Sequence, residues 1–257
     1  MRTVVVTGTA SGIGKALKGM LEADGHRVIG VDLRDADVTV DLTTAAGRTG
    51  LVEQVTALSG GTIDAVVANA GLSNGSPATL AVNYFGALAT LEGLRPLLTG
   101  SDAPRAAVTC SMASLLPVDD QLVDLTLAGD EAAALARAAE LAAAGTGDII
   151  YGSSKAAVAH WLRRVAPSAD WAGARIPLNA IGPGIVQTGM TAEMLATEES
   201  TKAVESHVPM PLGGIMGPEV PANLLRFLVS PENSHMCGQV VFVDGGSDVV
   251  IRGDKVW

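Results

Sequence analysis

Residues 3–17 read TVVVTGTASGIGKAL, and this stretch decides the fold. Its β-branched beginning, which ends at Gly8, is typical of a buried strand, and the part after Gly12 is typical of a helix. Together with Gly14, these glycines leave little side chain where the strand gives way to the helix. A phosphate group can then approach backbone N–H groups at the positive end of the helix dipole. The stretch predicts an anion-binding turn, and a purely structural glycine turn is the alternative.

The alternation of strand and helix continues along the chain. Apolar segments predict strands at residues 3–8, 26–33, 37–42, 63–71, 105–111, 175–182 and 238–246. Helical patterns fall at residues 12–24 and 79–98, after residue 150 and from about residue 218. Near-continuous apolar strands that alternate with helices are typical of an α/β fold with a parallel sheet covered on both faces. Since no linker interrupts the pattern, we expect residues 1–257 to form a single domain.

An acidic residue, Asp32, ends the second predicted strand 18 positions after Gly14. A carboxylate at this place can accept both hydroxyls of an adenosine ribose and repels a 2′-phosphate. The glycine spacing GxxxGxG differs from the GxGxxG of the general dinucleotide fingerprint. The strand before the turn, the helix after it and Asp32 nevertheless favour a bound dinucleotide, and NAD over NADP. Arg34 is interpreted as a solvated surface arginine.

A tyrosine and a lysine stand four positions apart in YGSSK, residues 151–155. On the predicted helix Tyr151 and Lys155 share a face. A nearby ammonium favours the phenolate and lowers the phenol pKa from about 10, so that the phenol can exchange a proton with an alcohol or carbonyl oxygen. Ser111 ends the fifth predicted strand, at the edge where doubly wound sheets bind ligands. Its hydroxyl can donate to the same oxygen, and ordinary packing of Tyr151 is the alternative.

The composition limits the classes of partner, the metal content and the cellular location that we expect. The 257 residues carry a formal net charge of −10, which argues against nucleic acid and anionic membranes as partners. The two cysteines, Cys110 and Cys237, form no CxxC or Cys/His cluster, so we expect no metal site. The N-terminal apolar run is too short for a signal peptide, and no stretch reaches about 18 apolar residues. We therefore expect a cytoplasmic protein without a membrane span.

Two segments depart from the alternation. Residues 116–148 begin with acidic positions and continue with an alanine-rich run that Asp130 can cap, which predicts a helical insertion. Residues 187–216 combine glycine and proline with the methionines Met190, Met194, Met210 and Met216. Methionine usually fills the core, but this concentration predicts an apolar lid that orders over a substrate. A hydrophobic alcohol or ketone is the expected substrate.

All these pieces occur in one order, and together they resemble the short-chain dehydrogenase/reductase family. The matching segments are TGTASGIG (7–14), Asp32, DL (41–42), NAG (69–71), VNYFGA (82–87), Ser111, YGSSK (151–155), NAIGPGIVQT (179–188) and VDGG (243–246). The resemblance implies a Rossmann-type, doubly wound parallel sheet of about seven strands, with the helical insertion before the Tyr/Lys helix. It also implies a nicotinamide cofactor and hydride transfer.

The resemblance assigns roles by position. It implies that Tyr151 is the acid/base and that Lys155 lowers its pKa and holds the nicotinamide ribose. Ser111, rather than Ser114, is implied to position the substrate oxygen, and Asn83 to support a proton-relay water. The implied contacts of NAD or NADH are Gly8, Thr9, Ser11, Gly12, Ile13, Gly14, Asp32, Leu33, Asp41, Leu42, Asn69, Ala70, Gly71, Tyr151, Lys155, Pro183, Gly184, Ile185 and Thr188. The implied contacts of the substrate are Ser111, Met112, Tyr151, Gly184, Met190 and Met194.

Within the family, the chain resembles the bacterial hydroxysteroid dehydrogenase/carbonyl reductase type. Ser111 and Tyr151 lie 40 positions apart, which is wider than the family usually has, because residues 116–148 stand between them. An NAD-dependent enzyme that interconverts a steroid-type 3-hydroxyl and 3-ketone is therefore the first expectation. Bulky aryl ketones, diketones or amino ketones are the next substrates. A non-catalytic dinucleotide-binding sensor is the alternative from another class.

The insertion also bears on assembly. We expect a homodimer or a homotetramer, because the Tyr/Lys helix is usually part of the dimer face in the family. An insertion directly before that helix predicts a dimer built with or around residues 116–148. A solvent-facing hairpin that leaves the assembly unchanged is the alternative.

Overall fold

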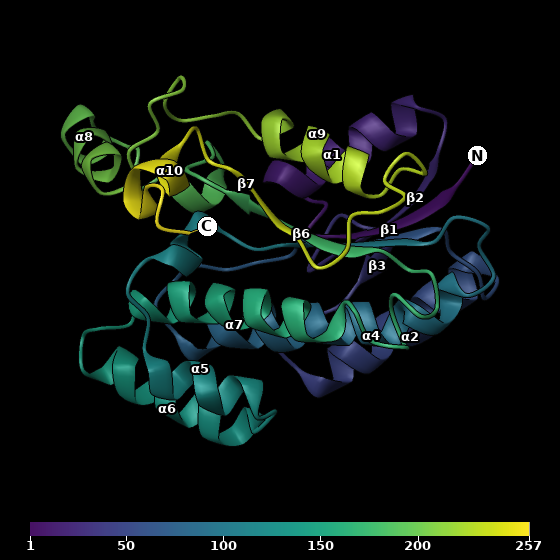
Figure 1. Ribbon diagram of the computed structural model, residues 1–257. Coiled ribbons are helices and arrows are strands. Elements are labelled where there is room, and N and C mark those ends of the chain that lie inside the picture. Colours follow the sequence, from purple (N-terminus) through teal and green to yellow (C-terminus); the bar gives the residue numbers. More distant parts are fainter. Residues whose placement is uncertain (257) are drawn as a thin grey trace.

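Seven parallel strands form the central sheet of the computed structural model, which describes residues 1–256 (Figure 1). The strands are β1 (Thr3–Thr7), β2 (Arg27–Asp32), β3 (Val38–Thr39), β4 (Ala65–Ala68), β5 (Arg105–Thr109), β6 (Leu178–Pro183) and β7 (Val240–Val243). They lie in the order β3-β2-β1-β4-β5-β6-β7, and every neighbouring pair is parallel. Strands β2 and β3 follow on one side of β1, and strands β4 to β7 follow on the other side. This reversal of the strand order between β1 and β4 leaves a crevice at the carboxyl ends of these two strands. The predicted doubly wound parallel sheet is confirmed.

Helices cover both faces of the sheet (Figure 1). One face carries α1 (Gly12–Ala23) and α9 (Glu219–Leu228), and the other carries α2 (Ala45–Ser59), α4 (Ala87–Leu98) and α7 (Ile149–Val165). Successive strand residues point to opposite faces. In β1, Val4 and Val6 therefore pack in the cluster that contains Leu17 of α1, while Val5 packs in the cluster that contains Leu51 of α2.

The helix predicted at residues 79–98 is interrupted. The chain forms α3 (Pro77–Leu80), then a π-helical segment over Ala81–Gly86, and only then α4. A wider π turn re-aims the side chains that follow it and is common at functional sites. Gly86 allows this segment to approach the loop after β3, because a Cβ there would lie 3.0 Å from the Cβ of Leu42.

The third strand is shorter than the predicted range 37–42. β3 spans only Val38–Thr39. Asp41 ends the extended run because its Oδ1 accepts hydrogen bonds from both the backbone N–H (2.9 Å) and the hydroxyl (2.7 Å) of Thr43. Such a local side-chain to backbone contact competes with strand pairing and turns the chain.

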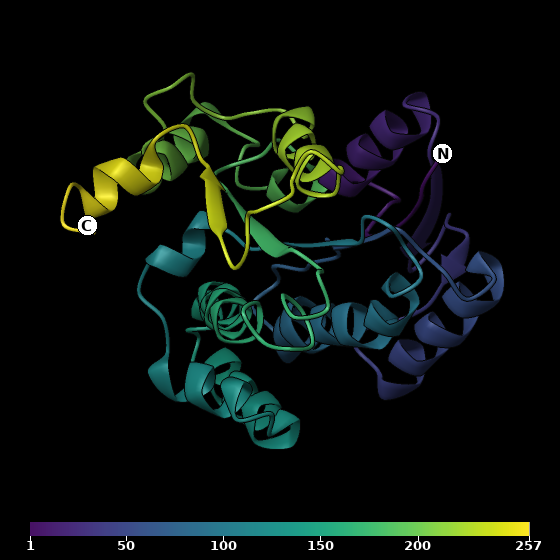
Figure 2. The same ribbon diagram turned by 45° about the vertical axis from the view of Figure 1, so that its right-hand side comes forward.

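The predicted insertion is helical and packs on the body of the protein. It forms α5 (Asp120–Leu127) and α6 (Glu131–Ala143), whose first N–H groups are capped by Asp119 and Asp130. Both helices lie on the outer side of α7 in the two views (Figures 1 and 2). Leu122 and Leu141 belong to the large core cluster. The insertion therefore packs on the body of the protein with one face and leaves its other face exposed.

The segment 187–216 contains more regular structure than a loop. It includes a 3₁₀ turn at Gly189–Thr191 and α8 (Glu198–His207), in which every residue is at least partly exposed. Its two ends are held together, since Val186 pairs with Met216 and the N–H of Gln187 donates to the Met216 carbonyl at 2.8 Å. Met210 is buried (8 % exposed) and packs with Met112 and Val208, so it is a core residue rather than part of a lid.

The described residues end with a helix that the sequence did not predict, α10 (Ser247–Arg252). Trp257 lies outside the described residues. None of the helices over residues 1–256 has the length and apolar character that crossing a membrane requires. Over the same residues, no group of three or more His, Cys, Asp or Glu side chains is arranged to hold a metal ion.

Candidate functional site

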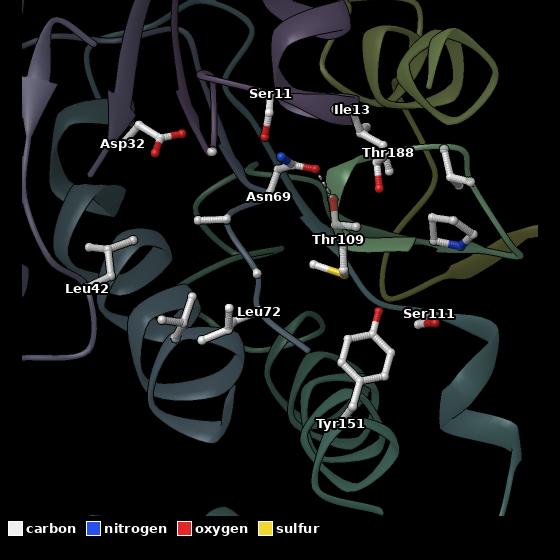
Figure 3. A pocket seen from close by; sticks show the side chains of 18 of the residues that line it. Ser11, Ile13, Asp32, Leu42, Asn69, Leu72, Thr109, Ser111, Tyr151 and Thr188 are labelled. Carbon is white, nitrogen blue, oxygen red and sulfur yellow. Dashed lines mark hydrogen bonds between the residues drawn. The ribbon is translucent and has the colours of Figure 1, made fainter. Parts of the chain in front are cut away.

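A cavity of about 310 Å³ opens at the carboxyl edge of the sheet (Figure 3). Figure 3 shows Asp32 and Leu42 at one end and Ser111 and Tyr151 at the other. The cavity is lined by Gly8, Ser11, Gly12, Ile13, Val31, Asp32, Leu33, Val40, Asp41, Leu42, Thr43, Asn69, Ala70, Gly71, Leu72, Val82, Thr109, Cys110, Ser111, Tyr151, Lys155, Pro183, Gly184, Val186, Thr188, Met190 and Thr191. The fold thus brings together residues from almost the whole length of the chain.

The glycine turn between β1 and α1 forms one wall. Gly8 and Gly12 have φ values of +81° and +53°, a left-handed backbone that side chains disfavour. Gly14 serves packing instead, because a Cβ there would lie 2.1 Å from the carbonyl oxygen of Gly8. The first turn of α1, with Ser11 and Ile13, therefore presents its unpaired N–H groups beside the cavity.

Asp32 holds the end of β2 against this turn. Its Oδ2 accepts a hydrogen bond from the backbone N–H of Ala10 at 2.9 Å, and its Oδ1 accepts one from the N–H of Leu33 at 2.7 Å. A carboxylate has about four acceptor sites, so each oxygen keeps capacity for a further donor. Asp32 can accept hydroxyl groups from a ligand while it fixes the local backbone.

A polar network fixes the strand ends between the two walls. The hydroxyl of Thr7 accepts hydrogen bonds from the N–H groups of Asn69 (3.0 Å) and Ala70 (2.9 Å). The Asn69 side chain donates to the Thr7 carbonyl at 3.1 Å and accepts from the Thr109 hydroxyl at 2.9 Å (Figure 3). These contacts tie β1, β4 and β5 together and leave Ala70 and Gly71 in the cavity wall.

Ser111 and Tyr151 place two hydroxyl groups at the same end of the cavity (Figure 3). Ser111 follows β5 and accepts a hydrogen bond from the N–H of Ala113 at 3.1 Å, which starts the 3₁₀ turn at Met112–Leu115. Ser114 uses its hydroxyl differently, since it donates to the Ser111 carbonyl at 2.7 Å. Of the two serines, Ser111 is the one that lines the cavity.

Lys155 lies one helical turn after Tyr151 and is buried (3 % exposed). Its Nζ donates to the Thr109 carbonyl at 2.8 Å and lies 5.8 Å from the centroid of the Tyr151 ring. Burial lowers the pKa of Lys155 to about 8. One backbone contact thus holds the Lys155 ammonium beside the phenol. Burial makes this ammonium lose its proton more easily than an exposed one.

The pKa of Tyr151 moves in the opposite direction to the sequence expectation. Burial raises it above the usual value of a phenol, although a hydrogen bond with Ser111 lowers it. The sequence argument weighed the charge of Lys155 but not the desolvation of the phenolate, which is the larger cause here. In this structure the neutral phenol is the favoured form, so Tyr151 is set up as a proton donor.

Asn83 acts from behind the cavity wall. Its Oδ1 accepts from the N–H of Leu72 at 2.8 Å, and its Nδ2 donates to the Leu72 carbonyl (2.9 Å) and to the Ser154 hydroxyl (3.0 Å). Ser154 in turn donates to the Tyr151 carbonyl at 2.7 Å. Asn83 therefore joins the loop after β4 to the helix that carries Tyr151 and Lys155.

Comparison with known proteins agrees with this geometry. The family model described as enoyl-(acyl carrier protein) reductase matches residues 8–248. A 3-alpha-hydroxysteroid dehydrogenase/carbonyl reductase from Comamonas testosteroni is 36% identical over 257 residues, which cover 98% of each chain. The chain belongs to the short-chain dehydrogenase/reductase family.

Other members of the short-chain dehydrogenase/reductase family match over most of the chain. The crystal structure of the 3-alpha-hydroxysteroid dehydrogenase from Pseudomonas sp. B-0831 complexed with NADH superposes with a TM-score of 0.87 and 38% identity, over 98% of this chain and 99% of that one. A tropinone reductase homologue from Arabidopsis thaliana is 27% identical over 274 residues, covering 96% of this chain and 90% of its own. The chain is accordingly an oxidoreductase of this family.

Six of the residues that the sequence assigned to this short-chain dehydrogenase/reductase site lie outside the cavity wall: Thr9, Gly14, Asn83, Ile185, Met112 and Met194. Thr9 is buried over Gly30, where a Cβ would lie 2.7 Å from the Thr9 hydroxyl. Met112 is 2 % exposed inside the cluster with Val208 and Met210, whereas Met194 is 46 % exposed. The backbone N–H of Ile185 faces the sulfur of Met210 at 3.3 Å.

The wall also includes residues that sequence reasoning did not select: Val31, Val40, Thr43, Leu72, Val82, Thr109, Cys110, Val186 and Thr191. Several are immediate neighbours of selected ones. Cys110 precedes Ser111, and Leu72 follows the NAG segment. Positions that flank the selected residues at the strand ends thus contribute to the cavity wall as well.

Proposed function

We propose that this chain is an NAD(H)-dependent oxidoreductase that interconverts a secondary alcohol and a ketone on a hydrophobic substrate, of the 3-hydroxysteroid/carbonyl type. One observation carries the proposal. The hydroxyl groups of Ser111 and Tyr151 face one end of a cavity whose other end holds the glycine turn and Asp32 (Figure 3). A proton donor and a dinucleotide-binding turn in one cavity suit the reduction of a carbonyl group.

The residues present fit a dinucleotide. The first turn of α1, around Ser11 and Ile13, lines the cavity with N–H groups that favour a pyrophosphate. Asp32 keeps acceptor capacity for the two hydroxyls of an adenosine ribose, and its charge disfavours a 2′-phosphate. These features support NAD(H) rather than NADP(H). When bound, the nicotinamide supplies or accepts the hydride.

The side chains around the cavity divide the remaining chemistry. Tyr151 donates its proton to the carbonyl oxygen during reduction and takes it back during oxidation. The hydroxyl of Ser111 donates a hydrogen bond to the same oxygen, which stabilises the charge that develops there. Lys155 would hold the nicotinamide ribose, and Asn83 supports the proton path through its contacts with Leu72 and Ser154.

The apolar part of the cavity wall supports a hydrophobic substrate. Met190, Val186 and Leu72 contribute apolar surface. Met190 is 44 % exposed and lies in residues 187–216, whose exposed part we propose as a lid. Two relatives at more than a third identity are 3-alpha-hydroxysteroid dehydrogenases by name. A 3-hydroxysteroid or 3-ketosteroid is therefore the first substrate to test.

The test is turnover with a substrate panel. We expect the absorbance of NADH to fall when the protein meets 3-ketosteroids, and to fall more slowly with bulky aryl ketones, diketones and amino ketones. NADH should work better than NADPH because of Asp32. Tight NADH binding without turnover across the whole panel would contradict the proposal and support a non-catalytic dinucleotide sensor.

We also propose that the protein assembles as a homodimer or homotetramer and works in the cytoplasm. The two cysteines, Cys110 and Cys237, are free thiols, which fits a reducing compartment. Among the described helices, α10 leaves Val249 (71 %) and Val250 (55 %) exposed, and β7 is an edge strand of the sheet. Apolar surface of this kind supports a contact with a second copy.

A further inference from the structure

One ion pair connects the insertion to the body of the protein beside the cavity. Glu131, the first residue of α6, accepts two hydrogen bonds from Arg48 of α2, with Nη1···Oε2 at 2.8 Å and Nη2···Oε1 at 2.6 Å. The two residues stand 83 positions apart in the chain. A bidentate, charge-assisted pair fixes both distance and orientation, which a single contact does not.

Arg48 also holds the loop after β3. Its Nε donates to the Leu42 carbonyl at 2.9 Å, and its Nη2 donates to the Thr43 carbonyl at 3.0 Å. Leu42 lies at the same end of the cavity as Asp32 (Figure 3), and the next residue, Thr43, also lines the cavity. Four of the five N–H groups of this guanidinium therefore serve either the cavity wall or Glu131.

The surroundings of Arg48 require a negatively charged partner, and the Glu131 carboxylate is that partner. The Arg48 side chain is only 12 % exposed, and its guanidinium lies 5.8 Å from the centroid of the Phe85 ring in the π-helical segment. A largely buried cation is costly unless an anion pairs with it. Glu131 is the carboxylate in hydrogen-bond contact with it, so the insertion supplies the charge that keeps Arg48 against the loop carbonyls.

The insertion fixes the place of Glu131. Asp130 caps α6 by accepting from the N–H of Ala133 at 3.0 Å. At the start of α5, the N–H of Asp119 donates to the hydroxyl of Ser153 at 3.0 Å. Ser153 lies on α7, two positions after Tyr151. The insertion is thus anchored to the Tyr/Lys helix and extends from there to the loop at the opposite end of the cavity.

We propose that Glu131 and Arg48 are positioning residues for the adenosine half of the dinucleotide. Glu131 holds the Arg48 guanidinium, the guanidinium holds the carbonyls of Leu42 and Thr43, and these carbonyls set the wall next to Asp32. The inference rests on the proposed function, because it concerns the binding of the proposed cofactor. It gives residues 116–148 a part in cofactor binding, separate from any part in assembly.

The test measures binding by calorimetry for the full-length protein and four variants. Glu131→Gln removes the charge, and Glu131→Asp restores it with a shorter side chain. Glu140→Gln is the matched control, since Glu140 lies on the same helix and pairs with Arg137, away from the cavity. Arg48→Lys keeps the positive charge but loses the bidentate hydrogen bonds with Glu131. Thermal unfolding shows that each variant is folded.

We expect Glu131→Gln and Arg48→Lys to weaken both NADH and ADP-ribose by about tenfold, as the loss of a charge-assisted pair predicts. Glu131→Asp should recover most of the affinity, and Glu140→Gln should match the wild type. The KM for NADH should rise in Glu131→Gln while kcat stays unchanged, which a general loss of stability would not produce. If Glu131→Gln binds NADH and ADP-ribose as Glu140→Gln does, the inference is wrong.

The two proposals fail in different ways. A wild-type protein that binds neither NADH nor NADPH overturns the proposed function. A wild-type protein that binds NADH, with unchanged affinity in Glu131→Gln and Arg48→Lys, overturns only the role of this pair. If Glu131→Gln does not fold, Arg48→Lys carries the same expectation by itself.

Discussion

Tyr151 combines a half-buried phenol with two polar neighbours, Ser111 and Lys155, and its chemistry follows from that combination. Burial keeps the proton on the hydroxyl, while Ser111 faces the same space. We expect Tyr151→Phe to lower kcat/KM by at least about a hundredfold, because it removes the proton donor and nothing else from the ring. NADH affinity should stay within about twofold of the wild type, as calorimetry would measure. A variant that keeps more than about a tenth of the rate would contradict the assigned role.

Lys155 makes stability depend on pH. Its pKa is lowered by burial to about 8 from the ordinary 10.5, so the unfolded chain holds the extra proton over a range in which the folded protein has released it. Stability from this group is therefore smallest below pH 8 and rises as the pH increases toward 10.5. Relative to Lys155→Met, the wild-type free energy of unfolding should rise by about 1 kcal/mol per pH unit between pH 8 and about 9.5. Urea denaturation at several pH values measures the difference, and a flat difference would refute it.

For single residues, the sequence predicted which side chains have suitable chemistry, but not which way those side chains point. Gly8, Gly12, Asp32, Ser111, Tyr151 and Lys155 all line one cavity, as their motif positions suggested. Whether a neighbouring side chain faces the cavity depends on the local backbone, which the residue type does not reveal. Met112 and Met194 had the right chemistry for an apolar wall, yet one is buried in another cluster and the other points to solvent.

Among the elements, the connection from α6 to α7 depends on a close backbone contact. A Cβ at Gly147 would lie 2.2 Å from the carbonyl oxygen of Gly75. We expect Gly147→Ala to lower the free energy of unfolding by about 1–3 kcal/mol, because the two backbones must separate. Urea denaturation provides the measurement.

Gly19 is the matched control for this substitution. It lies inside α1, and among the described residues no atom beyond its chain neighbours and the backbone of its own helix stands within 4 Å of the Cβ that it lacks. Gly19→Ala should therefore raise the free energy of unfolding by up to about 1 kcal/mol, through the better helix propensity of alanine. If both variants shift stability in the same direction, the packing argument for Gly147 is mistaken.

Helix and strand types were predictable where a pattern ran long enough. The alanine-rich run capped by Asp130 became α6, and the apolar runs became strands. Helices α8 and α10 and the π-helical segment were not predicted. Helix α8 has no strong apolar face to reveal it, and the π-helical segment depends on the approach of Leu42 to Gly86, which is a tertiary contact.

Across the whole molecule, the insertion covers the outer side of α7 (Figures 1 and 2). Exposed apolar side chains remain at α10. We expect Val249→Asp to shift the protein from a dimer or tetramer toward the monomer, because a buried charge at a contact between copies is costly. Light scattering coupled to size exclusion measures the mass. A wild-type protein that is already monomeric, or an unchanged mass in the variant, would contradict an assembly through this surface.

The global topology was predictable because each strand carries its own apolar signal and parallel sheets need cover on both faces. The helix cover and the seven-stranded sheet followed from this requirement. The way the insertion packs did not follow, because the contacts of Glu131 with Arg48 and of Asp119 with Ser153 join positions far apart in the chain. Only the folded structure brings these partners together.

The pairing of Val186 with Met216 makes the chain leave the body of the fold and return to it at one point. The exposed stretch around α8 lies between these fixed ends, and changing the length of a loop between fixed ends costs little free energy. Exchange of this exposed stretch, with Val208 and Met210 kept in the core, is therefore a direct route to variants with new selectivity, while the glycine turn and the phenol stay as they are.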